Sequence, residues 1–204
     1  MHGRDSLHPW VEARRDRVTF GLQLGTGGSD VEPGRKRIEA ARIADDLGFD
    51  ALYLGDHPAW GGDPFLLFAA MAMATERIFL GPMVSAAPYR NPLLIARLVS
   101  DLDHLSRGRF INGLGIGWNA AEYGMGANEF DRMGLPYPPT ADRQAALEEV
   151  ITIIRGLWGP APFTFHGRHH RVDQAQVSPP VQRPEPPLVL AGGGERVTLR
   201  QVAR

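Results

Sequence analysis

The sequence has no cysteine and a single lysine, Lys36, among its 204 residues. Without cysteine the chain forms no disulfide, no thiolate zinc site and no cysteine nucleophile, and it fits the reducing cytoplasm better than an oxidising compartment. Lys36 falls in a segment of helical periodicity, so aldolase-type Schiff-base chemistry lacks its nucleophile. We therefore expect a cytoplasmic protein whose chemistry rests neither on thiols nor on a Schiff base.

The sequence also lacks an excess of charge and any long apolar run. Its formal net charge is −1 and its pI ≈ 6.7, so it offers no broad positive field to nucleic-acid phosphates. The longest apolar run, residues 65–74, is shorter than the roughly 20 residues that a bilayer span requires. With 43% hydrophobic and 22% charged residues, the composition is that of an ordinary globular domain. We expect neither a nucleic-acid partner nor membrane insertion.

Residues 1–17 mix arginine with acidic residues and contain no apolar stretch of the kind found in secretory signals. We interpret them as a loose N-terminal leader. The remaining residues, 18–204, are assigned to a single domain.

Predicted strands and helices alternate along this domain. Two helix starts are clear, because Asp63-Pro64 and Asn91-Pro92 each combine a capping side chain with proline at the first helical position. A small hairpin is predicted from strands at 163–165 and 169–172. The other predicted strands are residues 18–25, 51–54, 78–80, 110–116 and 188–191, and the predicted helices cover residues 35–47, 63–75, 92–107, 141–158 and the segment from 195 onward.

Alternating strands and helices indicate parallel pairing with right-handed crossovers, in a barrel or in an open sheet. A complete (β/α)₈ barrel needs roughly 250 residues, and this chain supplies about five strand–helix units before it stops within a predicted helix. We therefore expect a parallel α/β fold of one of these two architectures, and we expect the chain to be truncated. In both parallel architectures, reactive groups gather at the carboxyl ends of the strands.

The second predicted strand ends in Asp56 and His57. A histidine at the mouth of a barrel can donate a hydrogen bond to a bound ring, or exchange a proton with a substrate. Alternatively, Asp56 caps a loop and His57 packs beside it. The residue types alone do not decide between these interpretations.

Glycines and bulky side chains follow the third and fourth predicted strands. From spacing alone, the segment around Met83 and Val84 is a turn before a helix cap. The fourth strand continues into the alternate glycines of Gly113-Leu114-Gly115-Ile116-Gly117-Trp118-Asn119, which allow another group to approach the backbone closely. Residues 115–120 also match G-x-G-x-x-A, but that dinucleotide motif normally sits on the first strand.

The fifth predicted strand ends in Gly192, Gly193 and Gly194 and leads into a helix. Free backbone N–H groups at such a turn suit a phosphate, and the alternative is a tight turn without a ligand. His166, His169 and His170 are not expected to bind a metal, because no acidic or cysteine partner is seen at ligand spacing. The sequence contains no G-x-S-x-G motif, and no H-x-H follows the first strand, which argues against hydrolase chemistry.

Ordered motifs along residues 18–204 carry a resemblance to a known family. They are ADDLGFDA (44–51) with Asp56-His57, ATERIFLG (74–81), Arg90-Asn91-Pro92, LDHLSRGR (102–109), GIGWNAAEY (115–123), and GGGE (192–195) with TLR (198–200) and VAR (202–204). In this order they resemble the luciferase-like monooxygenase superfamily, and within it the oxidoreductases that depend on the deazaflavin coenzyme F420.

The resemblance implies that the α/β fold is an incomplete (β/α)₈ TIM barrel. It further implies a tricyclic cofactor ring at the barrel mouth, with His57 at the reactive edge of the ring. It also implies that Asp56 lies in the cofactor site and that a bulge at Met83-Val84, which carries a non-prolyl cis peptide in relatives, supports one face of the ring. By similarity, Gly117, Trp118 and Asn119 line the ring or the ribityl chain, and Gly192, Gly193 and Gly194 hold the phosphate. No metal is implied.

By this resemblance the chain is an oxidoreductase that moves a hydride between F420 and a small organic substrate, with His57 as hydrogen-bond donor or acid, and it forms a homodimer. Three alternatives stay open: an FMN-dependent monooxygenase, an inactive truncated barrel that binds cofactor without turnover, and a phosphate-binding lyase or isomerase that uses Asp56 and His57. Trp118 stands where some sugar-phosphate dehydrogenases of the superfamily have glutamate, which argues against a sugar-phosphate substrate.

Overall fold

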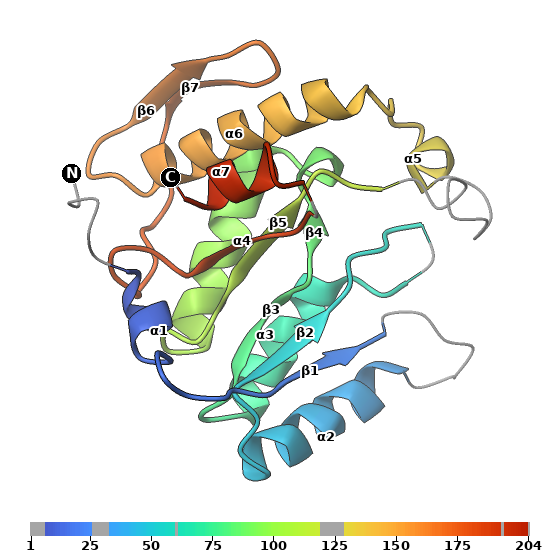
Figure 1. Ribbon diagram of the computed structural model, residues 1–204, viewed down its shortest axis with the longest axis vertical. Helices are drawn as coiled ribbons and strands as arrows, with labels where there is room; N and C mark the ends of the chain where they lie inside the picture. Colours follow the sequence, from blue (N-terminus) through green and yellow to red (C-terminus); the bar gives the residue numbers. More distant parts are fainter. Residues whose placement is uncertain (1–6, 26–32, 60, 119–128, 193, 204) are drawn as a thin grey trace.

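The computed structural model describes residues 7–25, 33–59, 61–118, 129–192 and 194–203. Parallel strands form its centre (Figure 1). In one sheet β2 (Ala51–Leu54) lies between β1 (Gly21–Leu24) and β3 (Phe79–Pro82), and in a second sheet β5 (Asn112–Gly115) lies between β4 (Ser85–Ala86) and β8 (Leu188–Leu190). A parallel bridge between Leu80 and Phe110 joins β3 to the β5 segment. The result is one parallel arc, in which β3 and β4 are successive parts of one strand path.

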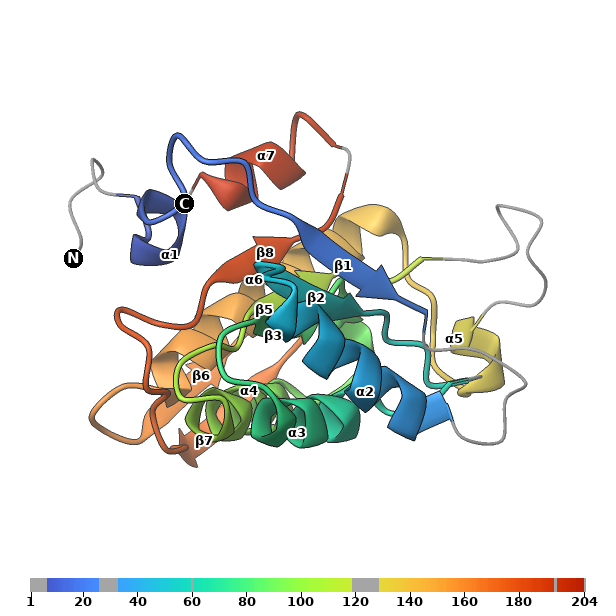
Figure 2. The same ribbon diagram turned by 90° about the horizontal axis from the view of Figure 1, so that it is seen from below.

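Four longer helices accompany this arc: α2 (Pro33–Asp46), α3 (Pro64–Ala74), α4 (Pro92–Leu105) and α6 (Thr140–Leu157). Helices α2, α3 and α4 lie on the same side of the strands (Figure 2). The predicted helix starts are confirmed, because the Asp63 carboxylate accepts from the Phe65 amide at 2.8 Å and the Asn91 side chain accepts from the Leu93 amide at 2.9 Å. The alternation of β and α units is that of a (β/α)₈ barrel, of which the arc forms a part.

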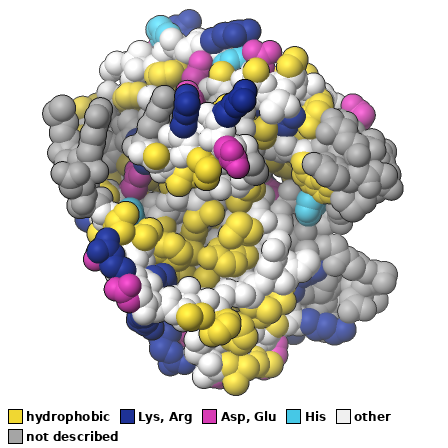
Figure 3. All heavy atoms as spheres, in the orientation of Figure 1, with side chains coloured by type: hydrophobic (Ala, Val, Ile, Leu, Met, Phe, Trp, Pro, Cys, Tyr) yellow, Lys and Arg dark blue, Asp and Glu magenta, His cyan; other side chains and the backbone are white. Residues whose placement is uncertain are grey.

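The hydrophobic core lies between the strands and these helices. It contains strand residues such as Leu52, Leu80 and Leu114 packed with helix residues such as Phe68 and Ile95, all of them 0% exposed. The opposite face of the arc is hollowed, and hydrophobic side chains line the hollow (Figure 3). The outer face of the strands is therefore covered by the helices, and the inner face is open to a ligand or to further chain.

The segment expected to be a loose leader contains a short helix, α1 (Pro9–Glu12). The Trp10 ring meets the Phe79 ring edge-on at 6.1 Å between centroids, and the Arg14 guanidinium lies over both rings at 4.4 and 4.6 Å. Phe79 is the first residue of β3, so this part of the leader packs against the amino ends of the strands.

The remaining elements are short. The predicted hairpin is present as antiparallel β6 (Phe163–His166) and β7 (Arg171–Ala175), and the helix expected after the fifth strand is α7 (Thr198–Val202). The 3₁₀ helix η1 (Ala87–Tyr89) and the helical turn α5 (Glu129–Arg132) were not predicted. Within the part of the chain that the structure describes, no helix combines the length and hydropathy needed to cross a bilayer.

Candidate active site at the carboxyl ends of the strands

The predicted site residues that the structure describes lie on one rim of the arc. All strands of the arc run parallel, with Leu54 paired to Pro82 and Leu114 paired to Leu190, so their carboxyl ends meet at the same edge. Asp56 and His57 follow β2, Met83 and Val84 separate β3 from β4, Gly117 and Trp118 follow β5, and Gly192 and Gly194 follow β8. Asn119 and Gly193 lie outside the described residues. The glycine turn is thus on the same rim as His57.

Asp56 is buried beneath the rim, and its side chain is 0% exposed. The Ser85 hydroxyl donates to Oδ2 at 2.6 Å, and the Arg90 guanidinium forms a two-pronged ion pair with both carboxylate oxygens, with Nη2 at 3.1 Å from Oδ1. Both oxygens therefore have partners inside the protein. The geometry is that of a carboxylate that holds the β2 loop in place, and it presents no side-chain surface of Asp56 to a ring at the mouth.

Arg90 forms ion pairs with two acidic side chains, Asp56 and Asp63. Its Nη2 also lies 3.2 Å from Oδ2 of Asp63, and its guanidinium lies 4.7 Å from the centroid of the Phe65 ring. Burial alone would lower the pKa of Arg90, but the hydrogen bonds and charges of Asp56 and Asp63 outweigh it and raise the pKa. Arg90 therefore joins the β2 loop, the start of α3 and η1 through one permanently charged group.

His57 lies at the surface of the rim, with 28% of its side chain exposed. Its Nδ1 is 3.2 Å from Oε2 of Glu129, and its ring meets the Trp118 ring edge-on at 6.2 Å between centroids. A partly exposed imidazole between a carboxylate and an indole can exchange a proton with a molecule bound at the mouth.

Glu129 is a site residue that the sequence interpretation missed. It is 1% exposed, its Oε1 accepts from the Ala59 amide at 3.1 Å, and its Oε2 accepts from the Tyr89 hydroxyl at 2.9 Å. Burial and then the charge of Glu129 raise the pKa of Tyr89, so the phenol keeps its proton. No motif marks Glu129 in the sequence, because it belongs to a one-turn helix that lies 72 positions beyond His57.

The bulge at Met83-Val84 explains the alternate glycines of β5. The peptide bond between these two residues is cis, as the resemblance implies. A Cβ on Gly115 would stand 2.7 Å from Val84 Cγ2, and a Cβ on Gly113 would stand 1.9 Å from the Pro82 carbonyl oxygen. The group that approaches the glycine backbone is thus the neighbouring strand, and the G-x-G-x-x-A match needs no dinucleotide.

Gly117 and Trp118 are placed by contacts from α5 and α6. Gly117 has φ of +75°, and a Cβ there would stand 2.6 Å from Cζ of Phe130. Arg143 donates to the carbonyl oxygens of Ile116 at 3.1 Å and of Gly117 at 2.6 Å. These contacts fix the backbone that carries Trp118 beside His57.

The glycine turn folds back onto the start of α7. Gly192 has φ of +154°, and a Cβ there would stand 2.7 Å from Oγ1 of Thr198. The Gly194 carbonyl accepts from the Leu199 amide at 3.3 Å. The close approach of Thr198 gives Gly192 a structural reason to be glycine, independent of any anion.

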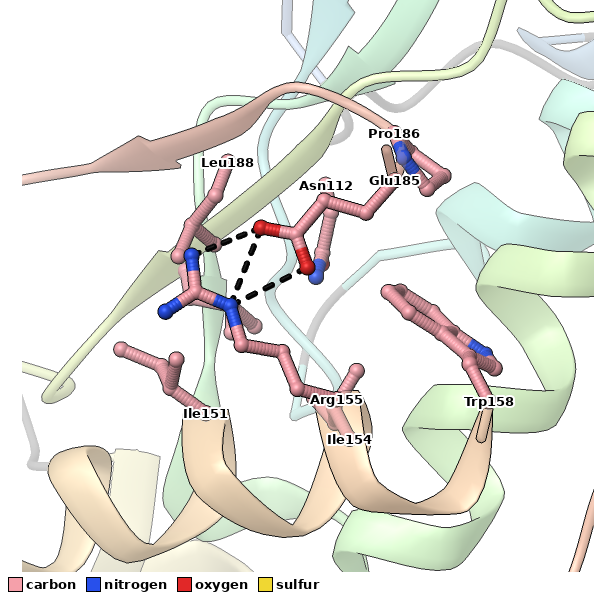
Figure 4. Close-up of a pocket in the computed structure, with 9 residues that line it drawn as sticks. Asn112, Ile151, Ile154, Arg155, Trp158, Glu185, Pro186 and Leu188 are labelled. Atoms are coloured by element: carbon pink, nitrogen blue, oxygen red, sulfur yellow. Dashed lines mark hydrogen bonds and ion pairs between the residues drawn. The ribbon is translucent and has the colours of Figure 1, made fainter. Parts of the chain in front are cut away.

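A small cavity lies at the other end of the strands (Figure 4). Its volume is about 10 Å³, room for one water, and its lining includes Asn112 and Leu188, the first residues of β5 and β8. Arg155 and Glu185 also line it and form an ion pair, with Nη2 to Oε1 at 2.6 Å. This cavity is too small for a cofactor and lies away from His57.

The histidines of the hairpin serve local contacts. The expectation that they lack an acidic neighbour was wrong for His166, whose Nε2 lies 2.5 Å from Oδ1 of Asp173. Glu149 of α6 accepts from the amides of Arg168, His169 and His170 at 2.8, 2.9 and 2.8 Å. Among the described residues no group of three potential ligands is arranged to hold a metal ion.

The fold and the rim define a class of protein: a barrel of parallel β/α units with a histidine, an indole and a glycine turn at the carboxyl ends of its strands. Comparison of the sequence with protein families specifies the class further. Residues 18–204 match the model of the luciferase-like monooxygenase family, and the chain belongs to that family.

Several proteins are similar to this chain in sequence or in structure. An F420-dependent glucose-6-phosphate dehydrogenase of Intrasporangium calvum is 34% identical over 181 residues, which cover 84% of this chain and 53% of the relative. The coenzyme F420 dependent tetrahydromethanopterin reductase of Methanopyrus kandleri has a TM-score of 0.74 at 26% identity, covering 88% of this chain and 52% of that one. The FMN-bound oxygenating constituent of 3,6-diketocamphane monooxygenase from Pseudomonas putida, with a TM-score of 0.72, 22% identity and coverage of 91% and 54%, shares the fold. The chain spans about half the length of these proteins.

Proposed function

We propose that this chain provides the cofactor end of an oxidoreductase that moves a hydride between the deazaflavin F420 and a small organic substrate. The observation that carries the proposal is the placement of His57 and Trp118 side by side on the same rim as the glycine turn. The inner face of the arc is also hollowed and lined by hydrophobic side chains (Figure 3). The relatives named for F420 support this cofactor.

The residues of the rim fit a flat aromatic ring with an anionic tail. Trp118 and the Met83-Val84 bulge offer apolar surface, Gly117 extends the same edge, and Gly192 and Gly194 offer backbone N–H groups. Asn119 and Gly193 lie outside the described residues, and their part in the site rests on the family resemblance alone. Asp56 acts indirectly, because its ion pair with Arg90 holds the loop that carries His57.

When bound, the deazaflavin accepts or returns the hydride, and the protein provides position and proton transfer. For a substrate in which a C–H bond adjoins an O–H group, a bound deazaflavin would take the hydride from carbon, and His57 would accept the hydroxyl proton. A carbonyl product forms, so electrons and protons balance. In the reverse direction His57 returns the proton as the carbonyl accepts the hydride.

A second candidate cofactor is FMN, as in a luciferase-like monooxygenase. The FMN-bound neighbour shares the fold, and the same rim and glycine turn suit either cofactor. We also propose that the substrate is a small molecule and that the partner is a second copy of the chain.

Titration of the purified protein with F420 and with FMN, followed by fluorescence, tests the proposal. We expect saturable binding of F420 at lower concentration than FMN. The reverse order would favour the monooxygenase, and binding of neither would overturn the proposal and favour a lyase or isomerase.

Replacement of His57 separates binding from chemistry. We expect His57→Ala to bind F420 but to lose hydride transfer by about 10²-fold or more in single turnover. His166→Ala, a surface histidine of the hairpin, is the matched control. Binding without any turnover in the unaltered chain would instead indicate a barrel that holds cofactor without catalysis.

A further inference from the structure

A buried acidic group stands behind His57. Glu129 reaches the imidazole from α5. Its carboxylate accepts from two donors, the Ala59 amide on Oε1 and the Tyr89 hydroxyl on Oε2, and His57 Nδ1 also contacts Oε2. These donors come from the β2 loop and from η1. The carboxylate therefore holds the β2 loop and η1 together on one side of the imidazole.

The chemistry of these atoms defines the direction of each hydrogen bond. A carboxylate oxygen accepts hydrogen bonds and has no hydrogen to donate, whereas a phenol and an imidazole N–H donate. Tyr89 keeps its hydroxyl proton because burial and the neighbouring Glu129 charge disfavour the phenolate. The proton in the Nδ1···Oε2 contact, at 3.2 Å, therefore belongs to the imidazole.

The tautomer has a consequence for proton transfer. Neutral imidazole carries one N–H, so a hydrogen on Nδ1 makes Nε2 the atom that accepts a proton. Once Nε2 has gained a proton, the imidazolium carries a positive charge next to the Glu129 carboxylate. A buried carboxylate held by two other donors stabilises that charge without having to reorient.

We propose that Glu129 is a positioning residue that fixes His57 in the Nδ1–H tautomer, and that Tyr89 and the Ala59 amide hold Glu129 in place for this task. The proposal rests on the role of His57 in the proposed function, but the tautomer is a property of the protein without cofactor. Its failure can therefore be distinguished from the failure of cofactor binding.

Long-range ¹H–¹⁵N correlation spectra of the cofactor-free protein measure the tautomer directly, with the His57 signals assigned from their loss in His57→Gln. We expect a protonated Nδ1 and an unprotonated Nε2 in the unaltered protein. Glu129→Gln is expected to abolish this preference, because an amide can donate to Nδ1 as well as accept from it. Asp131→Asn removes a charge from an exposed position of the same helix and is expected to leave the spectrum unchanged.

Single-turnover hydride transfer provides the second readout. We expect Glu129→Gln to slow the step on the order of 10²-fold, with the Kd for F420 little changed and Asp131→Asn equal to the unaltered protein. A proton on Nε2 in the unaltered, cofactor-free protein would overturn the proposal, and this measurement does not depend on whether any variant folds. A Glu129→Gln protein with an unchanged tautomer and an unchanged rate would overturn it as well.

Discussion

Arg90 is the residue on which the buried charges of the rim depend. It pairs with Asp56, whose side chain is fully buried, and with Asp63, which caps α3. We predict that Arg90→Ala lowers the free energy of unfolding by about 3–5 kcal/mol, because it leaves the Asp56 carboxylate buried without a cation. Urea denaturation measures the change, and Arg97→Ala on the exposed face of α4 is the control. A loss equal to that of the control would contradict the structural role of the pair.

Gly117 offers a test of how tightly the Trp118 segment is packed. A side chain at Gly117 meets both a positive φ and the Phe130 ring, whereas Gly134 has φ of +65° with no heavy atom near a Cβ. We predict that Gly117→Ala is more destabilising than Gly134→Ala by roughly 1–3 kcal/mol in thermal or urea unfolding, the cost of overpacking. Equal effects would mean that Phe130 yields freely and that the contact does not position Gly117.

The sequence predicted single residues where a motif followed a strand. The positions of His57, Gly117 and Trp118 on the rim could be predicted because these residues follow buried strands, whose carboxyl ends had to share an edge. Their roles in the site stay predictions. Glu129 was not found, because its position depends on the path of the chain from β5 to α5 and on packing of Phe130. The burial of Asp56 could not be predicted from the sequence either, because it depends on the direction in which the Arg90 side chain points.

At the scale of elements, Asp45 links the end of α2 to the turn between α3 and β3. Its carboxylate accepts from the amides of Glu76, Arg77 and Ile78 at 2.7, 3.0 and 2.7 Å. Burial alone would raise the pKa of Asp45, but these three hydrogen bonds and the charge of Arg77 outweigh it and lower the pKa. A carboxyl whose folded pKa lies below its unfolded value, roughly 3.9, stabilises the fold above that value, and the contribution is lost as the pH falls through the folded pKa.

We therefore predict that Asp45→Asn destabilises the protein at pH 7 by about 1–3 kcal/mol, and that its difference from the unaltered protein shrinks as the pH falls below about 4. Urea midpoints measured between pH 7 and pH 3 test this prediction. Asp46→Asn, at the exposed neighbouring position, is the control. If the difference in stability between Asp45→Asn and the unaltered protein were the same at every pH, the three amides would not be stabilising the charge of the carboxylate.

Elements with their own local signals were predicted well. The two helices that begin with a capping residue and proline start where expected, and the hairpin is present. The first strand is shorter than predicted: Val18 and Phe20 are 81% and 66% exposed, and pairing begins at Gly21 because its partner strand begins at Ala51. Apolar pattern alone does not show where a partner strand begins. The elements η1 and α5 have too few residues for a periodic signal.

At the scale of the whole molecule, the outer helices carry exposed apolar side chains. Ile43 of α2 and Leu47, the residue directly after α2, are 51% and 72% exposed, and Leu66 and Met73 of α3 are 75% and 71% exposed. We propose that a second copy of the chain packs here, as expected from the family resemblance. Sedimentation is predicted to show a dimer for the unaltered chain and a monomer for the double variant Leu66→Glu, Met73→Glu. A monomer in both cases would contradict the proposal.

Alternation of strands and helices predicted a parallel architecture but left a barrel and an open sheet unresolved. Neither the break between β3 and β4 at Met83-Val84 nor the close approach of Val84 to Gly115 is visible in a periodicity. The likeness to complete barrels of the family settles the architecture.

The central claim is that the cofactor ring lies on the rim formed by the carboxyl ends of the strands. Hydrogen exchange of backbone amides with and without F420 tests it most directly. We expect slower exchange in residues 55–57 and 115–118 and at the turn that contains Gly192, with exchange in residues 163–175 of the hairpin unchanged. Protection confined to the hairpin or to the amino ends of the strands, with the rim unaffected, would contradict it.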